Sequence, residues 1–281
     1  MKVYSDLSNK DYHSLNSHIS SSFIKNVAKH SVAKALEPSK PSPALLFGDA
    51  MHTYFEDREA FHARFKVFKD SKIIEQIMEK RPDIINPSMT KEYKSYKNDF
   101  MCSLGEHQEV ISEEDMEKIQ LMYNSAMDNG GLKQVYSQVD HDQMWDEYSF
   151  VTDQEDLYGL KYRVRPDRLL VDSDGNPKGI IDWKSCRDAS MKAFRSDFWR
   201  FRYDLQAVFY CEVLGVDVQD FYYVAIEKEF PYNTAVYSLD QETAISAAKE
   251  LSELKQRIAD WKKNPTQANI GLPNSNEIIL L

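Results

Sequence analysis

Two aspartates and a lysine in the middle of the chain have the types and spacing of a metal-dependent catalytic site. Asp167 begins one predicted strand, and Asp182 and Lys184 lie near the end of the next. Because side chains alternate along a strand, Asp182 and Lys184 lie on the same face. The turn-forming residues at 172–177 predict a hairpin that brings Asp167 beside them. Two carboxylates and one ammonium group would then converge at one point.

The chemistry that suits this group is phosphate hydrolysis with a divalent cation. Asp182 interrupts an otherwise apolar strand, and burying an unpaired carboxylate is costly. The neighbouring lysine or a metal ion would offset that cost. Two carboxylates and a backbone carbonyl suit Mg2+, a hard cation that retains several waters. Such an ion can hold a phosphate, lower the pKa of water and stabilise the leaving oxygen, while Lys184 adds a positive charge beside the phosphate.

A surface hairpin with an Asp–Lys ion pair is the alternative interpretation. It would be favoured if the D-x-K tripeptide stood alone, because that tripeptide is common. Here the preceding strand begins with R-P-D at residues 165–167, and a later predicted helix carries Gln206 and Tyr210. These two residues are four apart and lie on one face of that helix. Together, these features favour the metal site.

Basic residues are concentrated around these strands. The whole chain has a net charge of −10, which argues against a general nucleic-acid coat protein, but residues 157–205 hold eleven bases and seven acids. Arg187 and Arg195 alternate there with aromatic residues, a combination that suits a DNA strand through phosphate contacts and base stacking. Ser185 and Arg187 could bind a terminal phosphate. Alternatively, the aromatic residues belong to the core and the arginines to a solvated face; Trp199 is expected in the core.

The elements that must position these residues are helices first, then short strands, then helix, strand and helix. We expect helices over residues 20–34, over 45–65 and from 112 to a stop at 129–131, with a loop at 38–43. Runs rich in Tyr, Val, Ile and Leu at 144–151, 158–165, 167–171 and 179–184 predict an antiparallel meander. A helix over 198–214, strands at 220–227 and 235–239, and a long helix capped by Asp240 follow. This order predicts an α/β (α+β) fold.

The motifs R-P-D, I-D-W-K-S and Q-x-x-x-Y, in this order, resemble the PD-(D/E)XK nuclease superfamily. More narrowly, the chain resembles the RecE (exonuclease VIII) and RecB-nuclease group. Residues 19–23, I-S-S-S-F, resemble the first helix of RecE-like domains, and residues 47–52, F-G-D-A-M-H, resemble their G-x-x-x-H helix. The resemblance covers roughly residues 10–240, and Asp rather than Glu before the lysine is a variant that the family uses.

The resemblance implies a restriction-endonuclease-like core, with a mixed central sheet flanked by helices, and a role for each motif residue. His52, Asp167 and Asp182 would be metal ligands together with the carbonyl of Trp183. Lys184 would be catalytic, and Gln206 and Tyr210 would hold the site or the DNA strand. Ser185, Arg187, Arg165 and Arg195 would contact DNA. A packed side chain is the alternative for His52. Glu147 is a candidate further ligand, although we expect it in a solvated loop.

The function that follows from the resemblance is that of a Mg2+-dependent DNA exonuclease of phage or prophage origin, with Mn2+ able to substitute. It would degrade one strand of linear duplex from its end, 5′ to 3′, and leave single strands for recombination by annealing. The whole chain would be one nuclease domain: a mainly helical part at 1–135 with His52, a catalytic core at 140–240 and a C-terminal helix and tail at 241–281. The expected partners are double-stranded DNA ends, further copies in a closed trimeric or tetrameric ring, and a single-strand annealing protein.

Other functions remain open. The chain could be another PD-(D/E)XK endonuclease, a CRISPR-associated adaptation nuclease without an iron–sulfur cluster, or a silent DNA-binding module. Its three cysteines are too few for a four-cysteine cluster and are expected to have no function. No membrane-spanning run or signal peptide is visible, which favours the bacterial cytoplasm. The apolar residues 278–281 are expected to pack against another copy or against the chain's own core.

Overall fold

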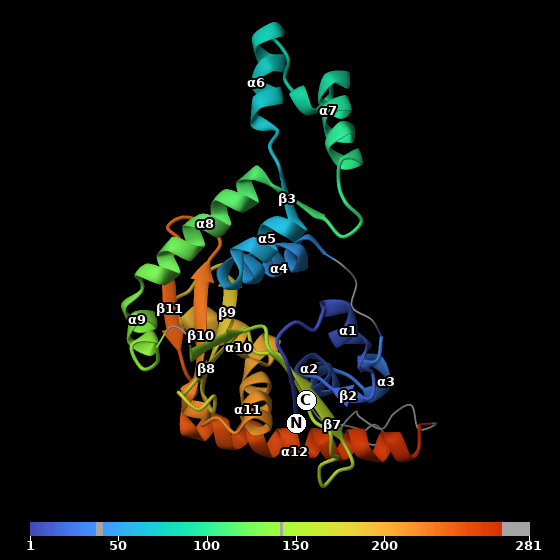
Figure 1. Ribbon diagram of the computed structural model, residues 1–281, viewed down its shortest axis with the longest axis vertical. Coiled ribbons are helices and arrows are strands. Elements are labelled where there is room, and N and C mark those ends of the chain that lie inside the picture. Colours follow the sequence, from blue (N-terminus) through green and yellow to red (C-terminus); the bar gives the residue numbers. More distant parts are fainter. Residues whose placement is uncertain (38–41, 141–142, 266–281) are drawn as a thin grey trace, which may run out of the picture.

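A five-stranded mixed sheet lies at the centre of the computed structural model, which describes residues 1–37, 42–140 and 143–265 (Figure 1). The strand order is β11–β10–β9–β8–β5. These strands are β5 (Met144–Asp146), β8 (Arg168–Val171), β9 (Pro177–Cys186), β10 (Phe221–Glu227) and β11 (Thr234–Tyr237). β9 pairs parallel with β10 and antiparallel with β8. With the helices that cover it, this sheet confirms the predicted mixed α/β class.

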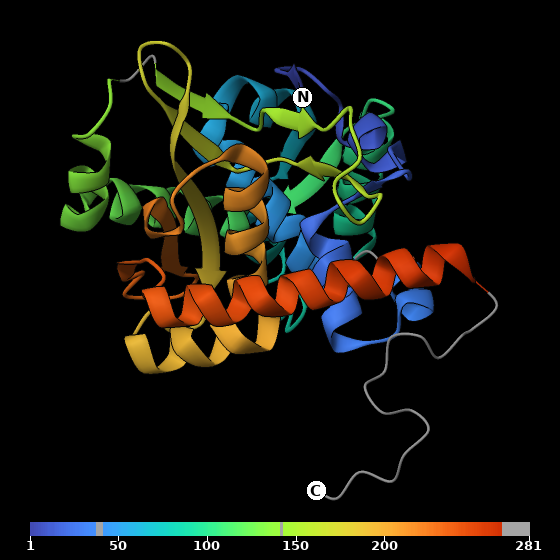
Figure 2. The same ribbon diagram turned by 90° about the horizontal axis from the view of Figure 1, so that it is seen from below.

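Each face of the central sheet is covered by its own apolar core. Because side chains alternate along a strand, one set of residues from β9 and β10 packs against α2 (Ser21–Lys29), α11 (Tyr203–Leu214) and α12 (Gln241–Lys263). The other set, which includes Trp183, packs against α4 (Pro43–Glu56) and α8 (Glu113–Asp128). Figure 2 shows α12 crossing the molecule beside α11. β9 therefore presents side chains to both cores.

A second sheet takes strands that we expected in the meander. Its order is β1–β6–β7–β2, made of β1 (Lys2–Tyr4), β2 (His18–Ile19), β6 (Ser149–Val151) and β7 (Lys161–Val164). The predicted meander over 144–184 is therefore wrong in part: only β5, β8 and β9 form it. The chain turns out of the central sheet at Glu147, whose φ is 54°, a value that is uncommon for residues other than glycine. β6 and β7 then pair with the two N-terminal strands.

Three predicted helices are each divided in two. The segment 20–34 forms α2 and α3 (Val32–Ala35), 45–65 forms α4 and α5 (Arg58–Arg64), and 198–214 forms the end of α10 (Met191–Phe201) and α11. The breaks lie at new N-caps, where Ser31 and Asp57 accept backbone hydrogen bonds, and at Arg202, whose φ is 57°. The expected cap Asp240 is confirmed, because it accepts the N–H of Thr243. Ser20 and Ser112 cap α2 and α8 in the same way, each accepting the N–H three residues further on.

An arm, residues 65–112, projects away from the rest of the molecule (Figure 1). Its root is a parallel pair, β3 (Phe65–Phe68) and β4 (Glu109–Ser112), and its outer part holds α6 (Ser71–Lys80), the 3-10 helix η1 (Pro87–Met89) and α7 (Lys91–Cys102). Arg64 joins the root of the arm to α4, because its guanidinium forms ion pairs with both Asp49 of α4 and Glu109 of β4. No sequence pattern described above predicts the arm.

The remaining described elements are α1 (Asn9–Ser14), α9 (Gly130–Tyr136) and the short η3 (Val218–Asp220). None of the helices within the described ranges combines the length and the apolar character needed to cross a membrane. The loop predicted at 38–43 lies partly, and the apolar residues 278–281 lie wholly, outside the described residues.

Candidate active site

Four side chains that can bind a metal ion lie together near the start of β8. His52 and Glu56 come from α4, Glu147 follows β5 and Asp167 precedes β8; one ligand atom of each lies within 4.8 Å of the others. His52 Nδ1 is 3.3 Å from Asp167 Oδ2 and 3.9 Å from Glu56 Oε1. His52 and Glu56 are one helical turn apart, so α4 presents both to the same side. We call these four residues the ligand cluster.

Burial disfavours the ionised form of the carboxyl groups in the ligand cluster unless a positive charge lies nearby. The side chain of Glu56 is 3% exposed, and its Oε1 has no hydrogen-bond partner among the residues that the structure describes. Burial, together with the charges of Glu147 and Asp167, raises the pKa of Glu56 well above its ordinary value. Burial also raises the pKa of Glu147 to about 7. A buried carboxylate oxygen without a hydrogen-bond partner, beside three other ligand groups, is suited to binding a divalent cation. The charge of that cation would allow these acids to ionise.

Asp167 connects the ligand cluster to the strand that carries the lysine. Its Oδ2 accepts a hydrogen bond of 2.7 Å from the backbone N–H of Trp183, and the antiparallel register of β8 and β9 places it opposite Asp182. Burial acts to raise the pKa of Asp167, but His52 and Lys184 outweigh it and lower that pKa. The same contact raises the pKa of His52, although burial acts in the opposite direction.

Asp182 and Lys184 form a buried ion pair on the side of β9 that faces α11. Gln206 of α11 donates a hydrogen bond of 2.6 Å to Asp182 Oδ1, and Lys25 of α2 donates one of 2.9 Å to Gln206 Oε1. Burial lowers the pKa of Lys25 to about 8, and Lys184 acts in the same direction. Burial also acts to lower the pKa of Lys184, but Asp182 outweighs it and raises the value to about 12. Two ammonium groups therefore lie close to one carboxylate.

Tyr210 and Arg165 support the backbone that leads into β8. The Tyr210 hydroxyl donates a hydrogen bond of 3.1 Å to the carbonyl oxygen of Arg165. The Arg165 guanidinium donates to Ser149 Oγ and Asn9 Oδ1, at 2.7 and 2.6 Å, and lies 3.5 Å from Glu147 Oε2. Arg165, predicted to contact DNA, thus has donors engaged within the protein and forms part of the wall beside the ligand cluster.

A cleft of about 740 Å³ opens onto the ligand cluster. Its walls come from α4, α5, the N-terminal segment and the chain around β5. The lining includes three cluster members and the arginine that supports them: His52, Glu56, Glu147 and Arg165. A substrate that enters this cleft therefore meets the ligand cluster first, with the Asp182–Lys184 pair beyond Asp167.

The geometry agrees with a comparison against family models. The model of a PDDEXK-like domain of unknown function (DUF3799) matches residues 20–270. The chain belongs to this family. The match includes the cluster residues, the Asp182–Lys184 pair and the Gln206–Tyr210 helix, and it confirms the superfamily indicated by the sequence motifs; the narrower RecE-like assignment stays a prediction.

A solved structure supports the fold of this PDDEXK-like domain. A candidate exonuclease from Eubacterium rectale matches with a TM-score of 0.54 and 13% sequence identity, over 98% of this chain and 95% of that chain. At such low identity the similarity shows a shared fold. A comparison with curated proteins finds no match.

Two residues of the candidate site, Glu56 and Lys25, were not predicted from the sequence, and Glu147 was expected elsewhere. Glu56 follows His52 by four residues, so the spacing H-x-x-x-E was a usable signal for a shared helix face. Lys25 had no such signal, because it meets Gln206 only through the packing of α2 against α11. Glu147, expected in a solvated loop, lies in the ligand cluster. Asp182 and the carbonyl of Trp183 are not among the four cluster ligands, and their role as further ligands stays a prediction.

The other residues predicted to contact DNA lie outside the ligand cluster. Ser185 follows Lys184 in β9 and lies on the opposite face of the strand. Arg187 is exposed just beyond β9, and Arg195 is exposed on α10. Trp199, expected in the core, is 45% exposed on α10, so that expectation is wrong.

The three cysteines are free thiols. Cys186 and Cys211 are buried, and burial raises the pKa of each to about 12. Cys102 is exposed on the arm.

Divalent-cation binding is expected to tighten as the pH rises from about 6 to about 8. Burial raises the pKa of Glu147 to about 7, so this group is largely protonated at the lower pH and must lose its proton before it can bind a cation. Calorimetric titration with Mn2+ at the two pH values, in buffers of different ionisation enthalpy, measures both affinity and proton release. Glu147→Gln should reduce this pH dependence, whereas the exposed Glu155→Gln should not. Equal affinity at both pH values would contradict the assignment.

Proposed function

We propose that this PDDEXK-like domain is a divalent-metal-dependent nuclease that hydrolyses a DNA phosphodiester at a duplex end. The observation that carries the proposal is the ligand cluster, connected through Asp167 to the Asp182–Lys184 pair. Together they provide ligands for a cation and a lysine for a phosphate within one site. Membership of a PDDEXK-like family supports a nuclease.

The residues of the site have separable roles in this reaction. A cation held by His52, Glu56, Glu147 and Asp167 would activate water and stabilise charge on the leaving oxygen. Lys184 would donate to a phosphate oxygen and to the attacking water, since an ammonium group has three donors. Gln206 fixes the orientation of Asp182 through the hydrogen bond of 2.6 Å. Lys25 adds a second positive charge, which favours an anionic substrate.

Magnesium is the proposed cation, with manganese able to replace it. Three of the four cluster residues offer carboxylate oxygens, the ligand type that Mg2+ prefers. The histidine nitrogen is a softer ligand that Mn2+ accepts readily. This choice stays a proposal because the ligand types suit both ions.

Action at DNA ends, within a closed ring of several copies, is the finer part of the proposal. Its support is the resemblance to RecE-like enzymes and the candidate exonuclease from Eubacterium rectale that shares the fold. The net charge of −10 also implies that electrostatics alone would hold DNA weakly. Enclosure would retain the enzyme on its substrate without a strongly basic surface. The 5′ to 3′ direction, the annealing partner and the role in recombination belong to the same proposal.

Linear duplex DNA should be degraded in Mg2+ while covalently closed circular duplex of the same sequence stays intact. A ring that loads at an end has no entry point on a closed circle. Gel analysis of both substrates, with EDTA as the control, measures this difference. Light scattering should give a mass several times that of one chain.

The alternatives give different results in the same assay. A monomer that cuts circles as fast as linear DNA would identify an endonuclease instead. Binding without cleavage of either substrate would indicate a silent DNA-binding module.

A further inference from the structure

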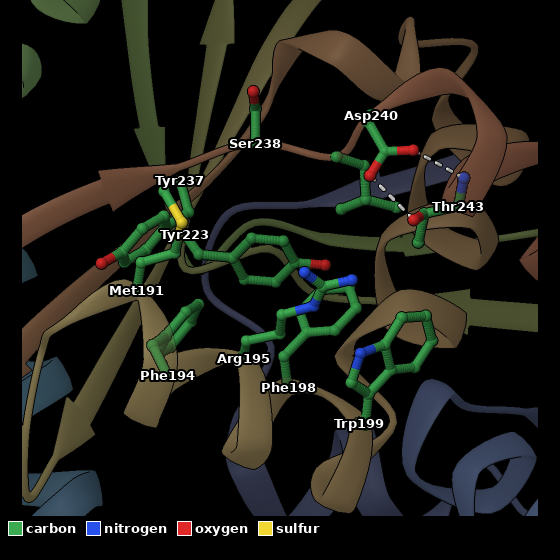
Figure 3. A pocket seen from close by; sticks show the side chains of 11 residues that line it. Met191, Phe194, Arg195, Phe198, Trp199, Tyr223, Tyr237, Ser238, Asp240 and Thr243 are labelled. Atoms are coloured by element: carbon green, nitrogen blue, oxygen red, sulfur yellow. Dashed lines mark hydrogen bonds between the residues drawn. The ribbon is translucent and has the colours of Figure 1, made fainter.

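A second pocket, lined in part by aromatic side chains, lies on the side of the central sheet that packs against α11. Figure 3 shows its lining. It has a volume of about 260 Å³ and is formed by α10, β10, β11 and the start of α12. Five of its eleven lining residues are aromatic: Phe194, Phe198, Trp199, Tyr223 and Tyr237. None of these residues has a role in the proposed hydrolysis.

One aromatic layer connects the pocket to the catalytic strand. Tyr223 on β10 is the register partner of Asp182 on β9. Its ring stacks on Tyr203, with centroids 5.9 Å apart, and the Lys184 ammonium lies 4.9 Å from the centre of the Tyr203 ring. Tyr223 also lines the pocket. The Tyr203 and Tyr223 rings thus lie between the Lys184 ammonium and the pocket, and a neighbouring nucleotide of a strand bound at Lys184 would have to span them.

The rim of the pocket offers a free positive charge and an exposed indole. Arg195 makes no hydrogen bond or ion pair with any residue in the described part of the chain and lies next to Trp199 and Phe198 (Figure 3). Trp199 is 45% exposed, and its ring meets Phe198 edge to face, with centroids 5.0 Å apart. The acid at the rim, Asp240, is already engaged, because both its oxygens accept hydrogen bonds of 2.8 Å from Thr243.

A second exposed ring with cations beside it lies at the end of α10. Phe201, at the end of α10, is 39% exposed. The Arg200 guanidinium lies 5.2 Å and the Lys29 ammonium 5.7 Å from the centre of its ring. Alternating cations and exposed aromatic faces are the arrangement that binds single-stranded nucleic acid through backbone contacts and base stacking.

We propose that this pocket binds one unpaired base of the DNA strand, stacked on Trp199, with the adjoining phosphate at Arg195. The proposal rests on the proposed function, since it places the pocket along the strand that reaches Lys184. A flat aromatic ligand with an attached anion satisfies both the apolar lining and the free guanidinium. A base within a duplex is held by its own stack, so the pocket selects unpaired nucleotides. An apolar peptide side chain would fill the lining but leave Arg195 without an anion.

The test uses duplexes that end in a short single-stranded tail. One base at a time is removed from the tail, leaving an abasic residue, and affinity is measured by fluorescence anisotropy in Ca2+ to prevent cleavage. The wild-type protein should bind about tenfold more weakly when the base at one tail position is absent. That penalty should disappear in Trp199→Ala and persist in Trp199→Phe, which keeps a ring. The exposed Leu157→Ala is the matched control and should retain the full penalty.

The outcomes separate this proposal from the proposed function. If the wild-type protein binds and cleaves DNA but no abasic position matters, or the penalty survives in Trp199→Ala, the pocket assignment is wrong while the nuclease assignment stands. If the wild-type protein neither binds nor cleaves DNA, both assignments fail. The contribution of Trp199 to the fluorescence is the difference between the wild-type protein and Trp199→Phe. If that difference changes with protein concentration but not with oligonucleotide, the pocket is a contact between copies of the chain, and the proposal fails.

Discussion

Replacing Lys184 by methionine is expected to reduce DNA cleavage by about 10³-fold while DNA affinity changes only a few-fold. The ammonium group is the donor closest to the Asp182 carboxylate and lies beyond the ligand cluster, where a phosphate oxygen would arrive. Methionine retains the length and apolar body of the side chain but has no charge. Cleavage rates in Mg2+ and affinities in Ca2+ should be measured on the same preparation.

The Lys184 variant must be shown to fold, because it leaves Asp182 buried without its partner. Removing one member of a buried ion pair typically costs about 3–5 kcal/mol of stability, so thermal unfolding should be recorded alongside activity. Lys178→Met is the matched control: it lies on the same strand, its side chain is 58% exposed, and it should retain wild-type cleavage. Near-normal turnover by a folded Lys184→Met protein would reject the catalytic role of this lysine.

Replacing Asp167 by asparagine is expected to weaken Mn2+ binding at least about 100-fold and to abolish cleavage. Removing even an outer partner of a metal ligand costs about 10- to 100-fold in affinity, and Asp167 is a cluster member. Asparagine removes the charge. Its amide oxygen can still accept at the Oδ2 position, which contacts both His52 and the N–H of Trp183, but the other oxygen is replaced by an NH2 group that cannot bind a cation. Calorimetric titration with Mn2+ measures the loss.

Companion variants test the other proposed ligands. His52→Ala should also weaken Mn2+ binding, and Asp182→Asn tests whether Asp182 is a further ligand. Asp174→Asn, in the exposed turn between β8 and β9, should titrate like the wild type. If His52→Ala binds Mn2+ normally, the histidine is not a ligand even where the carboxylates are; unchanged binding by Asp167→Asn would remove the basis of the whole cluster.

Local periodicity predicted how the residues at the centre of the candidate site lie relative to one another. The alternation along β9 places Asp182 and Lys184 on one face, and the turn before that strand brings Asp167 opposite Asp182. The spacing of Gln206 and Tyr210 likewise places both on one side of α11, where they contact Asp182 and the Arg165 backbone. These relations depend on residues that are close together in the sequence or on the regular geometry of one strand or helix. A sequence pattern can therefore predict them.

What the sequence did not predict depends on contacts between distant segments. Glu147 enters the ligand cluster because the chain adopts a positive φ there and leaves the central sheet, and no residue-type signal marks that change. β6 then pairs with β1, more than a hundred residues earlier. Lys25 joins the site through the packing of α2 against α11. In each case the deciding interaction is tertiary and overrides the local preference.

The pairing of β3 with β4 at the root of the arm affects how the length of the arm could change. β3 and β4 run side by side, with Phe65 opposite Glu109 and Phe68 opposite Ser112. The outer part of the arm begins after Phe68 and ends before Glu109. Because Glu109 lies opposite Phe65, these two points are separated by three residues along the strands, or about 10 Å. Because neighbouring parallel strands need a crossover connection, a link of about a dozen residues is required across that gap. Residues 69–108 are therefore an insert that could be shortened, lengthened or exchanged for another domain, while Arg64 still joins the root to the helix that carries His52.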